Sequence, residues 1–163
     1  MENNELIYGL PPFIPPKAKV LVLGSMPSVA SLKEGFYYMH KQNRFFKIIE
    51  ILCGYKLDTI ELRKKALNEL NIALYDVIEA CEREGSLDAK IKHIVPSDIK
   101  NLLNNHQSIK RVITNGALSK KLFLKYSFGV NIEVVHLPST SPANAVFNLD
   151  RLSSLYIKAL TEF

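Results

Sequence analysis

Four short β-rich runs, separated by helical patterns, constrain the fold of this chain more than any other feature. The runs are KVLVLG, IALYD, RVITNG and IEVVHLP, at residues 19–24, 72–76, 111–116 and 132–138. Helical patterns lie between and after them, at residues 44–54, 59–70, 96–106, 117–126 and 148–163. Strands that alternate with helices predict an α/β fold with a mostly parallel sheet. The first run is apolar after its lysine, as expected of a central strand covered on both faces.

Two residues mark predicted helix ends. Gly54 closes the apolar pattern of the first helix, where a glycine in left-handed conformation commonly caps the last turn. Ser97 stands before the pattern IKNLLNN, and its hydroxyl can accept a hydrogen bond from the first helical turn. The sequence therefore predicts a C-cap at Gly54 and an N-cap at Ser97.

Unusual polar segments follow three of the predicted strands. They are GSMPS at 24–28, TNG at 114–116 and LPSTSPAN at 137–144. An aromatic stretch, GFYYMHKQNRFF at 35–46, comes after the first of these loops. Because ligands bind at the carboxyl ends of the strands in such sheets, we expect all four segments to meet at one edge.

The loop GSMPS combines a glycine and a proline with small hydroxyl residues. A tight turn of this kind can direct the backbone N–H groups of Gly24, Ser25 and Met26 at a ligand, and the alternative is an ordinary turn. The loop lacks the spaced glycines and the lysine of a phosphate-binding loop, and it does not match a G-x-S-x-G nucleophile elbow.

The last polar loop places hydroxyl residues between two prolines. Pro138, Ser139, Thr140 and Ser141 form a rigid turn that can present hydroxyl and N–H groups to phosphate oxygens, and the alternative is a solvated loop. Asn115 offers a donor and an acceptor that suit the edge of a nucleobase, and the alternative is a helix cap.

The aromatic stretch holds more ring surface than one helix face explains. Phe45 and Phe46 fit the core of the helix that follows, whereas Tyr37 and Tyr38 do not. Aromatic rings outside the core can stack on a flat base, at roughly 1–3 kcal/mol per base. His40 fits a structural histidine better than a ligand, since the other histidines show no metal-binding spacing with it.

Composition limits the kind of protein this chain can be. At 163 residues the chain suits one domain over 1–163, of which residues 1–17 are an extended N-terminal segment. The net charge of +5 suits a polyanionic partner, and the two cysteines lack cluster spacing, which suggests a reducing cytoplasm. No apolar run is long enough to cross a membrane, and the N-terminus lacks the basic start of a secretory signal.

Taken in order, LGSMPS, EGFYYMHKQNRFFKII, ALYDVIEACEREGSLD, ITNGALS and LPSTSPAN resemble the uracil-DNA glycosylase superfamily. Within it, the sequence is most similar to the hypoxanthine-DNA glycosylase branch, from about residue 18 to the C-terminus. The resemblance implies a three-layer α/β/α sandwich with a four-stranded parallel central sheet. It also implies excision of a deaminated base from DNA, without a metal or other cofactor.

The resemblance assigns roles to individual residues. It implies that Asn43 orients the attacking water, that Asn115 contributes to activity, and that Tyr38 stacks on the flipped base. The residues expected to contact the base are Gly24, Ser25, Met26, Tyr38 and Phe45, and those expected to contact DNA are Pro138, Ser139, Thr140 and Ser141. Met26 stands where the mismatch-specific branch has a water-orienting Asn. Lys41 and Phe46 stand where the family favours Pro and Trp.

The sequence predicts a monofunctional, monomeric glycosylase in the cytoplasm, at the nucleoid, with DNA containing a deaminated base as its partner. Lys41 is the one nearby lysine that would make a Schiff-base mechanism possible. Two alternatives stay open. One is a DNA-damage-binding protein of the same fold that does not cleave, suggested by Met26, and the other is an α/β enzyme acting on free nucleosides. The sequence does not rank hypoxanthine, uracil and xanthine, or single and double strands.

Overall fold

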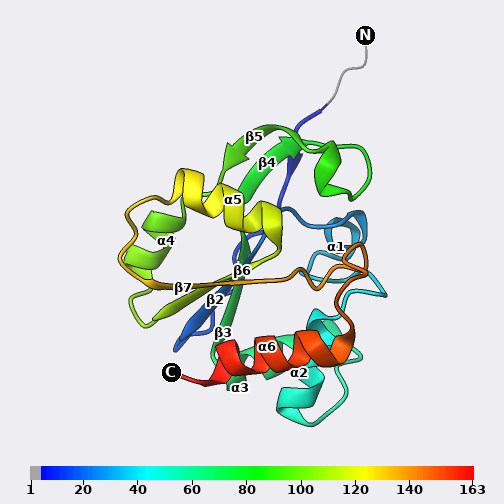
Figure 1. The fold of residues 1–163 in the computed structure, drawn as a ribbon, viewed down its shortest axis with the longest axis vertical. Coiled ribbons are helices and arrows are strands. Elements are labelled where there is room, and N and C mark those ends of the chain that lie inside the picture. Colours follow the sequence, from blue (N-terminus) through cyan, green and yellow to red (C-terminus); the bar gives the residue numbers. More distant parts are fainter. Residues whose placement is uncertain (1–4) are drawn as a thin grey trace.

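The computed structural model describes residues 5–163 and has a parallel sheet at its centre (Figure 1). The strands of this sheet are β3 (Ile72–Asp76), β2 (Val20–Gly24), β6 (Arg111–Asn115) and β7 (Glu133–Leu137), in that order. All three ladders are parallel, which confirms the predicted four-stranded sheet. Every residue of β2 is buried, as the apolar sequence of this run predicted.

Helices cover both faces of the parallel sheet and produce three layers (Figure 1). The helices on one face are α2 (Phe45–Cys53), α3 (Ile60–Leu70) and α6 (Leu149–Thr161). Those on the other face are α4 (Ile99–Asn105) and α5 (Ala117–Tyr126). The α/β/α sandwich that the sequence predicted is therefore confirmed.

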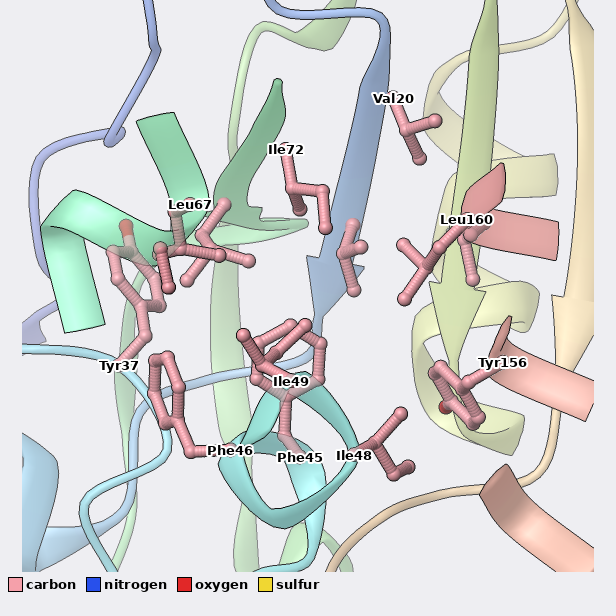
Figure 2. Close-up of a cluster of buried hydrophobic side chains, with 14 of the residues drawn as sticks. Val20, Tyr37, Phe45, Phe46, Ile48, Ile49, Leu67, Ile72, Tyr156 and Leu160 are labelled. Atoms are coloured by element: carbon pink, nitrogen blue, oxygen red, sulfur yellow. The ribbon is translucent and has the colours of Figure 1, made fainter. Parts of the chain in front are cut away.

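The larger apolar cluster lies between the sheet and α2, α3 and α6. Figure 2 shows Phe45 and Ile49 of α2 facing Ile72 on the sheet, with Tyr156 of α6 beside them. Phe45 and Tyr156 are completely buried. Burial of one such side chain contributes roughly 1.5–3 kcal/mol. The Tyr156 hydroxyl also donates to the Pro138 carbonyl at 2.7 Å, so this core supports the last polar loop.

One predicted helix end is confirmed and one is wrong. Gly54 has a φ of 81°, and its N–H donates to the Glu50 carbonyl, as expected of a left-handed C-cap. Helix α4 is capped by Asp98, whose carboxylate accepts from the Asn101 N–H at 3.1 Å. Ser97 is not the cap, because α4 begins at Ile99 and Asp98 therefore occupies the cap position, while Ser97 Oγ has no hydrogen-bond partner among residues 5–163.

A second, antiparallel sheet was not predicted. It contains β1 (Ile7–Tyr8), β4 (Ile78–Glu82) and β5 (Lys92–Pro96), in the order β1-β4-β5. Two further short elements are the helix α1 (Val29–Glu34) and the single turn η1 (Asp88–Lys90). The β4–β5 pairing is interrupted by register shifts, and β1 has only two residues, so neither carries a regular alternation of apolar residues.

The N-terminal segment runs along both sheets. Beyond β1, Phe13 exchanges backbone hydrogen bonds with Leu74 at 2.9 Å in each direction. Residues 1–4 of the predicted extended segment lie outside the described residues. Within residues 5–163, no helix is long and apolar enough to cross a membrane.

Candidate active site

A cavity of about 790 Å³ opens at the carboxyl edge of the parallel sheet. The segments that line it include residues 24–28, 86–88, 115–118 and 138–144, together with residues of the aromatic stretch. The expectation that the four unusual segments meet at one edge is therefore confirmed. Because parallel strands end at the same edge, residues far apart in the sequence share one pocket.

One side of the cavity, which we call the acid side, consists of Gly24, Tyr38 and Asp76. Gly24 pairs with Asp76 across the β2–β3 ladder. A Cβ atom on Gly24 would lie 2.5 Å from Asp76 Oδ1 and 3.2 Å from the Tyr38 hydroxyl oxygen. A side chain at this position would displace both groups. Gly24 is therefore needed for the close approach of the acid and the phenol.

Two polar atoms of the acid side have no partners. Within residues 5–163, neither Asp76 Oδ2 nor the Tyr38 hydroxyl has a hydrogen-bond partner, and both atoms are buried. Burial raises the pKa of Asp76 to about 7, the nearby charge of Asp88 contributes to the rise, and Arg83 opposes it. Burial also raises the pKa of Tyr38, as does the charge of Asp76, and the nearby Asn115 carboxamide opposes the shift. At neutral pH this side holds a phenol beside a carboxyl that is partly protonated.

A second group, which we call the amide side, consists of Asn115 and Thr140, which line the cavity, and Arg44, which does not line it but holds the loop that does. Asn115 Nδ2 donates to Thr140 Oγ1 at 3.0 Å, and its Oδ1 accepts from the Thr140 N–H at 3.0 Å. Thr140 lines the cavity but is completely buried. Its hydroxyl oxygen and its N–H are both bonded to Asn115, and the predicted DNA contact at Thr140 stays a prediction.

Arg44 holds the last polar loop from within. Its guanidinium donates to four backbone carbonyls, those of Thr140 at 3.2 Å, Ser141 at 2.6 Å, Asn144 at 2.9 Å and Phe147. Its backbone N–H also donates to the Thr140 carbonyl, at 3.1 Å. Arg44 therefore joins the start of α2 to the loop after β7. The sequence placed this arginine beside Asn43 but gave it no role.

Asn43 lines the cavity at the start of α2. Its Oδ1 accepts from the Phe45 N–H at 2.9 Å, and its N–H donates to the His40 carbonyl at 2.9 Å. These bonds fix the orientation of the carboxamide, whose Nδ2 takes no part in them. Asn43, which is expected to orient the attacking water, therefore has a defined position at the cavity wall.

The aromatic residues divide into two that line the cavity, Tyr37 and Tyr38, and others that support it. The Tyr38 ring lines the cavity, and the Phe45 ring lies 4.5 Å from it, centroid to centroid. Phe45 is completely buried in the core (Figure 2) and does not line the cavity, so we expect it to act on a bound base through the Tyr38 ring. Tyr37 is buried, and its hydroxyl donates to the Pro11 carbonyl at 2.8 Å.

The loop after β2 is held by a segment that sequence reasoning left without a role. Ser25 Oγ donates to Asp88 Oδ1 at 2.8 Å, and the Val29 N–H donates to Ser86 Oγ at 2.9 Å. Met26 is buried and also lines the cavity. The sequence signal for this part of the cavity wall was the polar run REGSLD, at residues 83–88, which follows the irregularly paired strand β4.

The histidines do not assemble a metal site. Among residues 5–163, no group of three or more His, Cys, Asp or Glu side chains is placed to hold a metal ion. His136 pairs through Nδ1 with Thr114 Oγ1 at 2.6 Å and does not line the cavity, in agreement with the strand alternation. His40 is at the rim, where its Nδ1 accepts from the Gln42 N–H at 3.1 Å.

The family of the chain follows from this fold and from comparison with known proteins. The family model of the Uracil DNA glycosylase superfamily matches residues 11–162, and the chain therefore belongs to this superfamily. A relative named "Hypoxanthine DNA glycosylase" from Methanosarcina barkeri is 34% identical over 113 residues, which cover 68% of this chain and 72% of the relative.

Two further similarities extend over nearly the whole chain. A second "Hypoxanthine DNA glycosylase", from Methanosarcina acetivorans, is 31% identical over 147 residues, or 89% of this chain and 92% of the relative. A solution NMR structure of a candidate uracil DNA glycosylase, also from Methanosarcina acetivorans, has a TM-score of 0.82 and 29% identity, and the match covers 96% of this chain and 97% of that one.

Proposed function

We propose that this protein is a monofunctional DNA glycosylase that hydrolyses the N-glycosidic bond of a flipped, deaminated base and leaves an abasic site. The observation that carries the proposal is the cavity of about 790 Å³, which brings the Tyr38 ring and the Asn43 carboxamide to one sheet edge. Membership of the superfamily and the names of two relatives support hypoxanthine as the first base to test.

The base enters the cavity after leaving the DNA stack. Extrusion costs a few kcal/mol, and less for a poorly paired, deaminated base. Stacking on the Tyr38 ring, with Phe45 packed beneath at 4.5 Å, offsets roughly 1–3 kcal/mol of this cost. Gly24, Ser25 and Met26 line the cavity and are proposed to contact the base from the loop after β2.

Cleavage needs a positioned water more than a strong base. The transition state of glycoside hydrolysis has oxocarbenium character on the sugar, so the nucleophile bonds late. The Asn43 carboxamide is held by its bond to the Phe45 N–H and is proposed to orient this water. Asn115 has one remaining amide hydrogen after its bonds to Thr140 and is proposed to act at the cavity wall.

The loop after β7 is the proposed DNA contact. Pro138, Ser139 and Ser141 line the cavity and are partly exposed, whereas the buried Thr140 connects them to the amide side. The positive net charge of +5 supports phosphate contacts, so DNA binding is expected to weaken steeply with salt. A free nucleoside, by contrast, would bind with little dependence on salt.

Hydrolysis is favoured over Schiff-base chemistry by the residues at the cavity. Among the described residues that line it, none is a lysine. Lys41, the candidate that the sequence left open, is exposed and does not line the cavity. The product is therefore expected to be an intact strand with an abasic site, which breaks only on treatment with alkali.

The test uses labelled duplexes with one deoxyinosine, deoxyuridine or deoxyxanthosine, followed by hot alkali. Wild type is expected to cleave at least the deoxyinosine duplex, and Asn43→Ala to reduce the single-turnover rate by roughly 100-fold or more. Gln42→Ala is the matched control, because Gln42 is an exposed amide one position away that does not line the cavity.

Two outcomes would contradict the proposal. If Asn43→Ala cleaves as fast as Gln42→Ala, the water is oriented by another residue. If wild type binds DNA but cleaves none of the three duplexes, the chain is a damage-binding protein, and the apolar Met26 in the cavity is the explanation.

A further inference from the structure

The acid side of the cavity holds two buried oxygen atoms without hydrogen-bond partners among residues 5–163, Asp76 Oδ2 and the Tyr38 hydroxyl. Buried polar atoms without a partner are uncommon in proteins, because each costs roughly 1–3 kcal/mol. Both groups line the cavity, and Asp76 is 3% exposed. The missing side chain at Gly24 makes room for both of them. A site built in this way is completed by a ligand with its own donor and acceptor.

The surroundings of Asp76 favour its neutral form. Asp88, beside η1, faces it with a like charge, and the Tyr37 and Tyr38 phenols add no positive charge. Among residues 5–163, Arg83, after β4, is the one cation that acts on it, and the guanidinium donates through Nη2 to the Pro27 carbonyl rather than to Asp76. A neutral carboxyl has one O–H donor and an acceptor oxygen, whereas a carboxylate only accepts.

Deamination changes the edge of a base in a way that this carboxyl can recognise. It replaces an exocyclic amino group with a carbonyl oxygen and leaves a ring N–H beside it. Hypoxanthine, uracil and xanthine all have this pair, an acceptor next to a donor, which adenine and cytosine lack. Guanine and thymine share the pair, so the carboxyl distinguishes hypoxanthine from adenine and uracil from cytosine but does not by itself exclude those two bases. A neutral carboxyl is its complement, because its O–H faces the carbonyl oxygen while its other oxygen faces the ring N–H.

We infer that protonated Asp76 donates a hydrogen bond to the carbonyl oxygen of the flipped base and accepts one from the adjacent ring N–H. The inference rests on the proposed glycosylase function and names a catalytic residue for it. When the bond from C1′ to the base breaks, its electron pair goes to the base, the water oxygen bonds to C1′, and the water proton passes to solvent. The hydrogen bond from Asp76 then stabilises the negative charge on the departing base.

Ionisation of Asp76 has a defined effect on the rate. A carboxylate at the same place cannot donate, and it repels the carbonyl oxygen and the leaving anion. Activity is therefore expected to fall as the pH rises through about 7, the pKa that burial and Asp88 give this group. An amide at position 76 keeps a donor and an acceptor but does not titrate.

The experiment measures single-turnover cleavage of a deoxyinosine duplex from about pH 5.5 to about pH 8.5. Wild type is expected to lose up to roughly tenfold per pH unit above about pH 7. Asp76→Asn is expected to have a flat profile, and Asp76→Leu to be slower by roughly 100-fold at low pH with unchanged DNA affinity. Asp58→Asn, at an exposed acid that does not line the cavity, is the matched control and is expected to keep the wild-type profile.

The outcomes separate this inference from the proposed function. If wild type cleaves at a rate that does not change with pH, the role of Asp76 is overturned, even if both variants fail to fold. The role is also overturned if Asp76→Leu folds and cleaves as fast as wild type. An Asp76→Asn profile that still falls above about pH 7 would assign the titration to another group. Absence of cleavage by wild type at every pH would instead contradict the glycosylase function itself.

Discussion

The polar groups on the two sides of the cavity differ in whether they have hydrogen-bond partners within the protein. On the amide side, Asn115 uses both ends of its carboxamide on Thr140, and Arg44 donates to four carbonyls. On the acid side, Asp76 Oδ2 and the Tyr38 hydroxyl are buried without partners among residues 5–163. Paired groups stabilise the loop after β7, and unpaired groups lower stability until a ligand supplies the missing bonds.

This difference indicates that the amide side supports the structure of the pocket, whereas the acid side is available to bind a ligand. A residue whose hydrogen bonds are satisfied inside the protein mainly sets the position of others, and its loss is expected to cost stability. A residue held without partners is expected to cost function when it is removed while stability rises. Substitutions on the two sides should therefore change the free energy of unfolding in opposite directions.

The largest effect is expected for Arg44→Ala on the amide side. The substitution leaves four carbonyls of the loop after β7 without their donor, which is expected to lower the free energy of unfolding by roughly 3–5 kcal/mol. Urea unfolding measures the change. Arg151→Ala is the control, because Arg151 is exposed and only stacks on the Phe147 ring, and equal losses in the two variants would remove the distinction.

A smaller effect of opposite sign is expected for Asp76→Asn on the acid side. In the folded protein the pKa of Asp76 is about 7, against an ordinary 3.8, so the folded state holds this proton more tightly than the unfolded chain does. The stability that the proton provides is present below about pH 4 and is lost as the pH rises through about 7. At about pH 8, Asp76→Asn is expected to raise the free energy of unfolding by roughly 2 kcal/mol.

Thermal unfolding at two pH values measures this change. Little difference between Asp76→Asn and wild type is expected at about pH 3, where the carboxyl is largely protonated in both states. A variant that is less stable than wild type at about pH 8 would show that the carboxylate has a stabilising partner, and the contrast between the two sides would fail.

The smallest effects are expected for two conservative changes, one on each side. Tyr38→Phe removes a buried hydroxyl that has no partner and is expected to raise stability by about 1 kcal/mol or less. Thr140→Val removes a hydroxyl that accepts from Asn115 and is expected to lower it by about 1–2 kcal/mol. The urea midpoints of the two variants, compared with wild type at equal slope, show whether each change raises or lowers stability. A change in the same direction for both variants would contradict the difference between the two sides.

Much of the fold was predictable because the parallel sheet is a local pattern repeated along the chain. The run IALYD coincides with β3, and the other strands differ from their predicted bounds by a residue or two. The antiparallel sheet was missed because its strands are short or irregular. Ser97 was predicted as the cap of α4, whereas the helix begins one residue later and is capped by Asp98, because Ser and Asp are both good N-caps and the apolar pattern does not fix a helix start to one residue.

The site was predictable in its segments but not in the state of its side chains. Thr140 sits in a polar loop and looked available to DNA, whereas its partner Asn115 lies 25 residues away in the sequence. From the sequence, Asp76 is only the last residue of a predicted strand. Nothing near it in the sequence indicates that its carboxyl is buried or that Asp88 lies close to it. Hydrogen-bond partners and pKa shifts depend on contacts between residues far apart in the sequence, so they cannot be predicted from periodicity and loop composition.

The bond between Arg44 and Thr140 has a consequence for folding. It joins residues 96 positions apart, and every ladder of the main sheet is parallel and needs a long crossover. Contacts of such long range form slowly and late. Tyr38 and Phe45, seven residues apart, can meet while the chain is still incomplete, but the wall of the cavity cannot. We therefore expect the aromatic surface for a base to form before the cavity around it, and detachment of the loop after β7 to open the cavity while that surface persists.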